Sequence, residues 1–493
     1  MEQMVVKTRQ GEVRGRGSGS ADDVLAFLGI PYAAAPSGSN RFRPPAAAPA
    51  WEGVRDAVEF GPTAPGPGYP PPFDVLLPEP SRPGDDYLNL NVWTPDPGGS
   101  GLPVMVWIHG GAFVSGSSAV PIYDGARFAR DGVVFVSLNY RLGADGFALL
   151  PDATPNRGLL DQVAALRWVQ DNIVAFGGDP DNVTVFGESA GGMSVGTLLA
   201  MPRAEGLFRR AILQSGAAHH VLSPATASRV AGYLAEQFGV AATRESLAAI
   251  PPADLVRAQR ALAAQFQAAP DPAKWGEIVA NLMIFEPVVD GDVLPGPPIE
   301  RVAAGTSAGI DILVGANRDE HRLFLVPTGV ADTITDAALA AVVAGYRLPP
   351  GALDRYRAAR PDAVPGVLLA DVMTDFFYRL PAVRLAEAHP GTHLYEFDWT
   401  SPAYGGRLGS CHALELPFVF DTLDVPEAEA LVGEAPPQRL ADAMHRAWVG
   451  FAATGDPGWP AYGDTRTVRR FGATTETVDD PRGELRELWA GIR

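Results

Sequence analysis

One serine in this sequence stands in a pattern that favours covalent catalysis. Ser189 is the central residue of Gly-Glu-Ser-Ala-Gly at residues 187–191, which matches the G-x-S-x-G pattern of a nucleophile elbow. The β-branched and aromatic run at residues 183–186 predicts a buried strand, and residues 193–200 predict a helix. A tight turn between them needs glycines, because Cβ atoms beside the serine would clash with the strand and helix. The pattern therefore predicts a serine hydroxyl exposed above a sheet.

A serine hydroxyl becomes a useful nucleophile only when a histidine takes its proton and a carboxylate orients that histidine. Among the eight histidines, His412 follows the last strong predicted strand, in a loop that leads into an apolar segment. This is where an α/β-hydrolase carries its general base. His389 and His393 have i, i+4 spacing, but Pro390 and Gly391 interrupt any helix between them. One cysteine cannot build a zinc site either, so we expect no metal. From its place in the chain, we take His412 as the base.

The acid should follow a strand that lies between Ser189 and His412 in the chain. Residues 312–314 predict such a strand, and a glycine turn and two carboxylates, Asp319 and Glu320, come after it. Both side chains have the required chemistry, so these residues alone do not decide between them.

Backbone N–H groups are needed to stabilise an oxyanion. Gly110 and Gly111 directly follow the predicted strand at residues 104–108, and consecutive glycines let two amides point at one oxygen. The amide of Ala190 would be a third donor. Losing one such donor typically costs about a hundred- to a thousand-fold in rate. We interpret the neighbouring His109 as a structural residue that positions this loop.

The elements around these residues alternate between strand and helix, which predicts a doubly wound α/β sheet. We expect residues 5–14 and 24–28 to form short strands at a sheet edge. Prolines are dense at residues 62–83, and because a strand-like segment follows at once, we interpret this segment as a loop or lid within one domain covering residues 1–493. The predicted inner strands are residues 88–93, 104–108, 133–138, 183–186, 312–314 and 393–399, and the predicted long helices are residues 158–176 and 439–453.

Composition excludes several classes of partner. The chain has 493 residues, 46% of them hydrophobic, and its 39 basic and 57 acidic residues give a net charge of −18. This charge argues against nucleic acid or an anionic membrane as a partner. We expect a cytoplasmic protein, a monomer or small homo-oligomer, since there is one cysteine, no recognisable signal peptide and no apolar run near the roughly 18 residues that a membrane helix needs.

Further motifs extend nearly from end to end of the chain. They are F-L-G-I-P-Y-A at 27–33, D-D-Y-L-N-L-N-V at 85–92, N-Y-R-L-G at 139–143, G-L-L-D-Q at 158–162, F-G-G-D-P at 176–180 and Q-S-G at 214–216. With the elbow, the glycine loop, the Asp-Glu pair and residues 412–420, the chain resembles the type-B carboxylesterases, in the bacterial para-nitrobenzyl esterase branch of the α/β-hydrolases. The resemblance implies a mostly parallel central sheet with helices on both faces and with insertions that form a gorge.

The resemblance also assigns roles to residues. It implies Ser189 as the nucleophile, His412 as the base and Glu320, rather than Asp319, as the acid. Gly110, Gly111 and Ala190 would form the oxyanion hole, and Ser215 would be a hydrogen-bonding residue behind the triad. One departure concerns Tyr87, which stands where the family usually has a cysteine bridged to the proline-rich loop. The rigidity of this loop must therefore come from proline, and the shape of the gorge does not follow from the family.

We accordingly expect a cofactor-free serine carboxylesterase that hydrolyses small to medium uncharged alkyl and aryl esters through an acyl-enzyme intermediate. Phe113, Met283 and Phe324 are our candidates for the walls of the substrate pocket. Two other functions stay open. One is an amidase or carbamate hydrolase, since the same triad serves these reactions and only the pocket decides. The other is a non-catalytic binding module.

Overall fold

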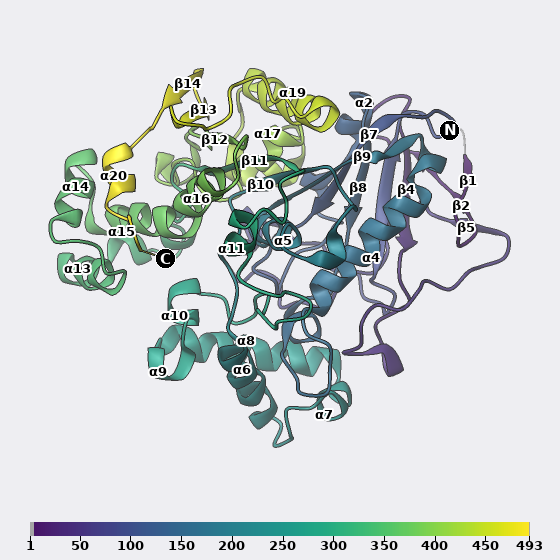
Figure 1. Ribbon diagram of the computed structural model, residues 1–493, viewed down its shortest axis with the longest axis horizontal. Coiled ribbons are helices and arrows are strands. Elements are labelled where there is room, and N and C mark those ends of the chain that lie inside the picture. Colours follow the sequence, from purple (N-terminus) through teal and green to yellow (C-terminus); the bar gives the residue numbers. More distant parts are fainter. Residues whose placement is uncertain (1–3, 493) are drawn as a thin grey trace.

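The computed structural model describes residues 4–492, which are organised around a mixed sheet of 11 strands (Figure 1). The strand order is β14-β13-β12-β11-β10-β9-β7-β8-β6-β4-β3. The strands from β13 to β8 run parallel, whereas β14 at one edge and β6, β4 and β3 at the other are antiparallel to their neighbours. The strands are β3 (Arg16–Gly17), β4 (Leu25–Pro31), β6 (Asn89–Thr94), β7 (Leu102–Ile108), β8 (Val134–Leu138), β9 (Gly178–Glu188), β10 (Arg210–Gln214), β11 (Asp311–Asn317), β12 (His393–Phe397), β13 (Thr467–Phe471) and β14 (Thr475–Asp479).

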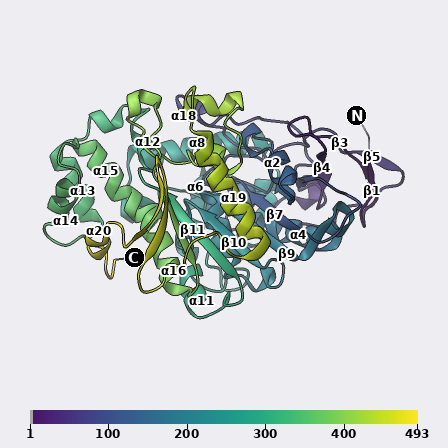
Figure 2. The ribbon, with the colours of Figure 1, turned by 90° about the horizontal axis from the view of Figure 1, so that it is seen from above.

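Each central strand supplies two hydrophobic cores because successive side chains point to opposite faces. In β7, Val104 and Val106 pack on one face with helices α4 and α5, while Met105 and Trp107 pack on the other with α2, α17 and α19. Figure 2 shows α19 lying across the sheet. These helices are α2 (Ala126–Arg130), α4 (Arg157–Asn172), α5 (Ala190–Leu198), α17 (Leu416–Val419) and α19 (Gln438–Thr454). The expected α/β fold with helices on both faces is confirmed.

Two helical insertions extend from the carboxyl ends of neighbouring parallel strands. The segment between β10 and β11 contains α6 to α11, most of which form the lower part of the molecule in Figure 1, and the segment between β11 and β12 contains α12 to α16. The helices of the first insertion are α6 (Pro224–Glu236), α7 (Arg244–Ala248), α8 (Pro252–Ala268), α9 (Pro272–Trp275), α10 (Ile278–Asn281) and α11 (Pro298–Ala303). The helices of the second insertion are α12 (Arg322–Leu325), α13 (Asp336–Gly345), α14 (Ala352–Ala359), α15 (Pro365–Thr374) and α16 (Leu380–Ala388). Elsewhere in the chain lie the short helices α1 (Phe73–Leu76), α3 (Gly143–Phe147), α18 (Glu429–Val432) and α20 (Gly483–Glu487).

The proline-rich segment is a closed loop that contains only the short helix α1. Its ends are joined where the N–H of Thr63 donates to the carbonyl of Arg82 at 2.9 Å and the N–H of Arg82 donates to Thr63 Oγ1 at 3.0 Å. The chain therefore leaves and returns at the same place. Tyr87, at the position of the missing cysteine, is buried just beyond this closure.

The main errors of the sequence-based prediction lie at the sheet edges. Residues 5–14 do form strands, β1 (Val5–Lys7) and β2 (Glu12–Arg14), but these pair with β5 (Val54–Asp56) in a separate three-stranded sheet. Each of the two strands buries a single residue, Val6 or Val13, so they cover the core from one side and do not extend the main sheet.

Candidate active site

The elbow predicted around Ser189 is present at the end of β9. Ser189 has φ 55° and ψ −125°, a left-handed backbone conformation that is costly for a residue with a side chain. Its N–H donates to the carbonyl of Gln214 at 2.9 Å, and α5 begins at the next residue, Ala190. The strained turn is thus held by the neighbouring strand β10.

The glycines of the elbow are required by close packing. A Cβ atom added to Gly187 would lie 2.5 Å from the carbonyl carbon of Gly191, and one added to Gly191 would lie 2.0 Å from the carbonyl oxygen of Ile108. Real Cβ atoms essentially never approach other atoms this closely. Any side chain at these positions would therefore displace the turn that presents Ser189.

The glycine loop after β7 lies directly against the elbow. A Cβ atom on Gly110 would lie 3.0 Å from Cβ of Ser189, and Gly111 has φ 113°. The next two residues, Ala112 and Phe113, also have positive φ angles of 52° and 60°. This unusual run turns the backbone sharply beside the serine, where amide donors for an oxyanion are needed.

His109 is buried behind this loop. Its ring stacks on Tyr140 with the ring centroids 4.6 Å apart, and its Nδ1 atom lies 2.8 Å from the carbonyl oxygen of Gly110. The Tyr140 hydroxyl donates to the carbonyl of His109 at 3.0 Å. Burial lowers the pKa of His109 to about 4, so this imidazole is neutral at neutral pH. These contacts fit a residue that positions the glycine loop.

The predicted base lies beside one of the two candidate acids. Nδ1 of His412 is 2.6 Å from Oε2 of Glu320, and both side chains are buried. The other carboxylate oxygen of Glu320 accepts the backbone N–H of Asn317 at 2.7 Å. Glu320 is therefore fixed at both oxygens and can hold the imidazole in one orientation and one tautomer.

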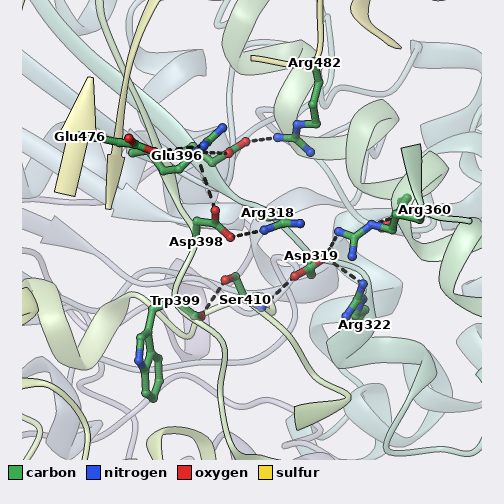
Figure 3. A network of polar contacts seen from close by, with 12 residues as sticks. Arg318, Asp319, Arg322, Arg360, Glu396, Asp398, Trp399, Ser410, Glu476 and Arg482 are labelled. Carbon is green, nitrogen blue, oxygen red and sulfur yellow. Dashed lines mark hydrogen bonds and ion pairs between the residues drawn. The ribbon is translucent and has the colours of Figure 1, made fainter. Parts of the chain in front are cut away.

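The other candidate, Asp319, lies in a network of arginines (Figure 3). It forms ion pairs with Arg322 and Arg360, and its Oδ2 atom accepts the backbone N–H of Ser410 at 3.1 Å. The N–H of Asp319 in turn donates to the carbonyl of Ser410 at 2.9 Å. Asp319 thus joins the loop that carries Glu320 to the loop that carries His412.

A third carboxylate lies at the other side of the imidazole. Nε2 of His412 is 3.0 Å from Oε1 of Glu188, the residue before Ser189. Burial alone would lower the pKa of His412, but the charges of Glu188 and Glu320 outweigh it and raise this pKa to about 9. Burial raises the pKa of Glu188 to about 8, against the opposing charge of His412. Sequence reasoning missed Glu188, although it stands inside the elbow motif itself.

Ser189, His412, Glu188 and the glycine loop line one cavity. Phe324, one of the predicted wall residues, lines it, and its ring centroid is 5.4 Å from that of His412. The proline-rich loop, interpreted from the sequence as a loop or lid, supplies part of the wall. The lining residues are Tyr69, Leu77, Pro78, Glu79, Gly110, Gly111, Ala112, Gly116, Val120, Ile122, Tyr123, Glu188, Ser189, Phe324, His412, Ala413, Leu416 and Leu431.

Two predicted wall residues do not line this cavity. Phe113 is fully buried and packs edge-on against Phe147, with ring centroids 4.9 Å apart, because the positive-φ run before it turns its side chain into the core. Met283 is half-buried against the core formed with the first helical insertion. Ser215 is buried behind the elbow, and its Oγ atom has no hydrogen-bond partner within residues 4–492, so its expected hydrogen-bonding role stays a prediction.

Comparison with known proteins identifies the family. The carboxylesterase family model matches residues 2–476. The chain is 39% identical to the para-nitrobenzyl esterase of Bacillus subtilis, over 99% of this chain and 98% of that protein. The chain belongs to the carboxylesterase family. This esterase is also 35% identical to the phenmedipham hydrolase of Pseudarthrobacter oxydans, over 90% of both chains.

Solved structures agree with this assignment. The crystal structure of the Geobacillus stearothermophilus carboxylesterase Est55 matches with a TM-score of 0.86 and 39% identity, over 98% of this chain and 99% of that one. A structure of a para-nitrobenzyl esterase matches with a TM-score of 0.84 and 36% identity, over 99% of both chains. The protein is a carboxylic ester hydrolase of the α/β-hydrolase fold.

Between residues 4 and 492, no group of three or more histidine, cysteine, aspartate or glutamate side chains is arranged to hold a metal ion. No helix in the same span is both long and apolar enough to cross a membrane.

Proposed function

We propose that Ser189, His412 and Glu320 hydrolyse small to medium uncharged carboxylic esters, both alkyl and aryl, through an acyl-enzyme intermediate. One observation carries this proposal: Ser189, His412, Gly110 and Gly111 line the same cavity, and Glu320 holds His412 from behind. An ester that enters this cavity meets a nucleophile, a base and the backbone that we propose to stabilise the oxyanion.

In the first half of the reaction, Ser189 Oγ attacks the ester carbonyl carbon while its proton passes to Nε2 of His412. The Nε2 atom must exchange its contact with Glu188 for one with Ser189 Oγ in this step. The negative charge that develops on the carbonyl oxygen is stabilised by the N–H groups of Gly110, Gly111 and Ala190. When the carbon–oxygen bond to the alcohol breaks, His412 returns its proton to the leaving oxygen.

In the second half, water attacks the acyl-enzyme. His412 takes one proton from the water as the new bond forms to the acyl carbon. The tetrahedral intermediate then collapses, the bond to Ser189 Oγ breaks, and the proton goes back to the serine. The carboxylic acid leaves and the enzyme is restored. Glu320 holds the imidazole in place and stabilises the imidazolium that forms in each half.

The walls of the cavity support the proposed substrate class. Tyr69, Tyr123 and Phe324 supply aromatic surface, and Leu77 and Leu416 supply aliphatic surface. Such a lining favours apolar acyl and aryl groups over charged carboxylates or phosphates. The name of the related para-nitrobenzyl esterase also refers to an aryl-bearing ester.

The test is hydrolysis of para-nitrophenyl esters from acetate to dodecanoate by the wild type, by Ser189→Ala and by the surface control Ser100→Ala. We expect rates that peak at short acyl chains, vanish in Ser189→Ala and persist in Ser100→Ala. Equal rates in the wild type and Ser189→Ala would overturn the assignment of the nucleophile. Matching anilides and carbamates, measured in parallel, decide whether the amidase or carbamate alternative describes the enzyme better.

We further propose that residues 1–493 form one domain that works in the cytoplasm as a monomer or small homo-oligomer, with no nucleic acid as partner. Both large hydrophobic cores lie against the same sheet, and the only cysteine of the sequence, Cys411, is buried and free. Light scattering of the purified protein would test the oligomeric state.

A further inference from the structure

One carboxylate in the wall of the active-site cavity has no part in the mechanism above. Glu79, from the proline-rich loop, lines this cavity together with Ser189 and His412. Its Oε1 atom accepts the backbone N–H of Gly116 at 2.7 Å. Its Oε2 atom is buried and has no hydrogen-bond partner within residues 4–492. Buried carboxylate oxygens are normally paired, so Glu79, which lines the cavity, has an unused acceptor.

The route to this cavity is acidic. A second, more open cavity shares Tyr69, Leu77, Pro78 and Glu79 with the first, so Glu79 stands where the two meet. The second cavity adds the carboxylates of Asp74, which is exposed, and Glu427. No lysine or arginine lines either cavity. Apart from His412 beside Ser189, the ionisable side chains that line the two cavities are carboxylates and tyrosines, in a chain whose net charge is −18.

An aromatic ring accompanies the carboxylate. Tyr69 lines both cavities, and the pKa of its hydroxyl is raised by burial and then by the negative charges of Glu79 and Glu188. A carboxylate and an aromatic ring in the wall of one cavity are a suitable environment for an organic cation, which is attracted by both.

We propose that Glu79 binds a protonated amine on the substrate, so that the enzyme prefers esters that carry an ammonium group over neutral esters of the same shape. The inference rests on the proposed function and extends its substrate class. The ligand must carry an N–H, because Oε2 lacks a hydrogen-bond donor; a quaternary ammonium would satisfy the charge but not this acceptor. A charge-assisted hydrogen bond of this kind is short and strong.

The position of Glu79 gives the amine a second effect. Gly116, whose N–H donates a hydrogen bond to Glu79, packs against the glycine loop. A Cβ atom on Gly116 would lie 2.3 Å from the carbonyl oxygen of Gly110. Glu79 thus places negative charge on the side of the cavity where the oxyanion is proposed to form. An ammonium group bound to Glu79 neutralises this charge during the reaction, so the preference should appear in kcat/KM.

The test compares isosteric esters. 2-(Dimethylamino)ethyl acetate, protonated at pH 7, is paired with 3-methylbutyl acetate, and ethyl 3-(dimethylamino)propanoate is paired with ethyl 4-methylpentanoate. The first pair places the amine on the alcohol and the second on the acyl group. In the wild type we expect kcat/KM to be higher for the amine in at least one pair. A ratio of one or below in both pairs would overturn the proposal without any variant.

Glu79→Gln keeps an amide oxygen to accept the N–H of Gly116, and it replaces the charged acceptor Oε2 with an NH2 group that cannot bind an ammonium group. We expect the amine-to-isostere ratio to fall about tenfold, which corresponds to about 1.4 kcal/mol, because the variant removes the charge-assisted hydrogen bond to the amine. The matched control is Glu59→Gln, a carboxylate that is exposed and lines neither cavity. This variant should keep the wild-type ratio.

The outcomes separate the two proposals. If neutral isosteres are hydrolysed in a Ser189-dependent manner but the ratio is the same in the wild type and Glu79→Gln, the role of Glu79 is wrong and the esterase assignment stands. If Ser189→Ala hydrolyses the neutral isosteres as fast as the wild type, the proposed nucleophile itself is wrong. If Glu79→Gln does not fold, the wild-type ratio measured at low and high salt decides: attraction to the acidic route requires that the ratio fall as salt is added.

Discussion

The imidazole of His412 lies between two buried carboxylates, with Nε2 at 3.0 Å from Oε1 of Glu188 and Nδ1 at 2.6 Å from Oε2 of Glu320. Only the Glu320 contact belongs to the proposed triad. Glu188 meets the nitrogen that must receive the Ser189 proton. Since both carboxylates stabilise the imidazolium and raise the pKa of His412 to about 9, the base is fully available only at alkaline pH.

Replacing Glu188 with glutamine should move the activity of the enzyme toward lower pH. The variant removes one negative charge from the imidazolium, so the pKa of His412 falls and more of the histidine is neutral at a given pH. An opposite charge at this distance typically shifts a pKa by about 1–3 units. We therefore expect the acid limb of kcat/KM against pH for para-nitrophenyl acetate to shift by at least about one unit in the acid direction.

The matched control for this change is Glu188→Asp, which keeps the charge but shortens the side chain. It should leave the acid limb much closer to that of the wild type. An unmoved limb in Glu188→Gln would contradict the electrostatic role of Glu188, even if the overall rate changed.

The two adjacent carboxylates Asp319 and Glu320 should give opposite phenotypes. Glu320→Gln leaves a similar shape but no charge to hold the tautomer of His412, so we expect kcat to fall by about 10²- to 10⁴-fold with a small change in melting temperature. Asp319→Asn weakens two ion pairs with arginine, so we expect mainly a loss of stability, with about 3–5 kcal/mol as the upper range for breaking a buried pair.

Steady-state kinetics and thermal unfolding of both variants check this pair of predictions. A kinetic control is the pH profile of Asp319→Asn, which should keep the wild-type limb position because Asp319 does not contact His412. Loss of kcat in Asp319→Asn equal to that in Glu320→Gln, at unchanged stability, would show that the acid has been assigned to the wrong residue.

Gly110→Ala should damage catalysis through crowding of the nucleophile. The new Cβ atom would lie 2.8 Å from Oε2 of Glu188 and 3.0 Å from Cβ of Ser189, so the glycine loop must move away from the serine. Displacing one oxyanion donor typically costs about 10²- to 10³-fold in kcat. We expect a loss of this size for para-nitrophenyl acetate.

Gly232→Ala is the control for the glycine substitution. Gly232 lies in α6, and a Cβ atom there would have no neighbour within 4 Å, so its activity should match the wild type. Wild-type kcat in Gly110→Ala would mean that the oxyanion donors lie elsewhere.

The sequence was sufficient to predict the centre of this molecule because its signals there are local and steric. The elbow requires glycines on both sides of Ser189, and the buried strands β7 and β8 are continuous apolar runs. The sequence alone left Asp319 and Glu320 equivalent. What separates them is the direction of two side chains, which depends on Arg322 and Arg360, and no spacing in the sequence reveals this.

The elements that were missed carry charged residues. The buried strand β10 begins with Arg210, whose guanidinium donates to the carbonyl of Ala452 at 2.9 Å. Because its first residue is charged, the sequence of this strand does not look like that of a buried strand. Strand β13, which pairs with both β12 and the edge strand β14, contains two half-buried arginines. The edge strand β14 carries glutamate and aspartate at exposed positions. The wall residues depend on backbone geometry that the sequence does not reveal: Phe324 lines the cavity, whereas Phe113 lies in a run of positive φ angles and is buried in the core.

The stability of the protein should depend on pH through Glu415, which is buried with its oxygens accepting from Gln214 at 3.1 Å and Asn317 at 2.6 Å. Burial, and then the charge of Glu320, raise the pKa of Glu415 from 4.5 to about 7. A carboxyl group with a higher pKa in the folded state binds its proton more tightly there, so its contribution to stability is lost as pH rises from 4.5 through about 7. At about 1.4 kcal/mol per unit this loss is at most about 3.5 kcal/mol. Glu415→Gln cannot ionise, so its free energy of unfolding should fall less than that of the wild type between pH 5 and pH 8. Urea unfolding at both pH values measures the two differences, and equal differences would mean that Glu415 keeps an ordinary pKa in the folded protein.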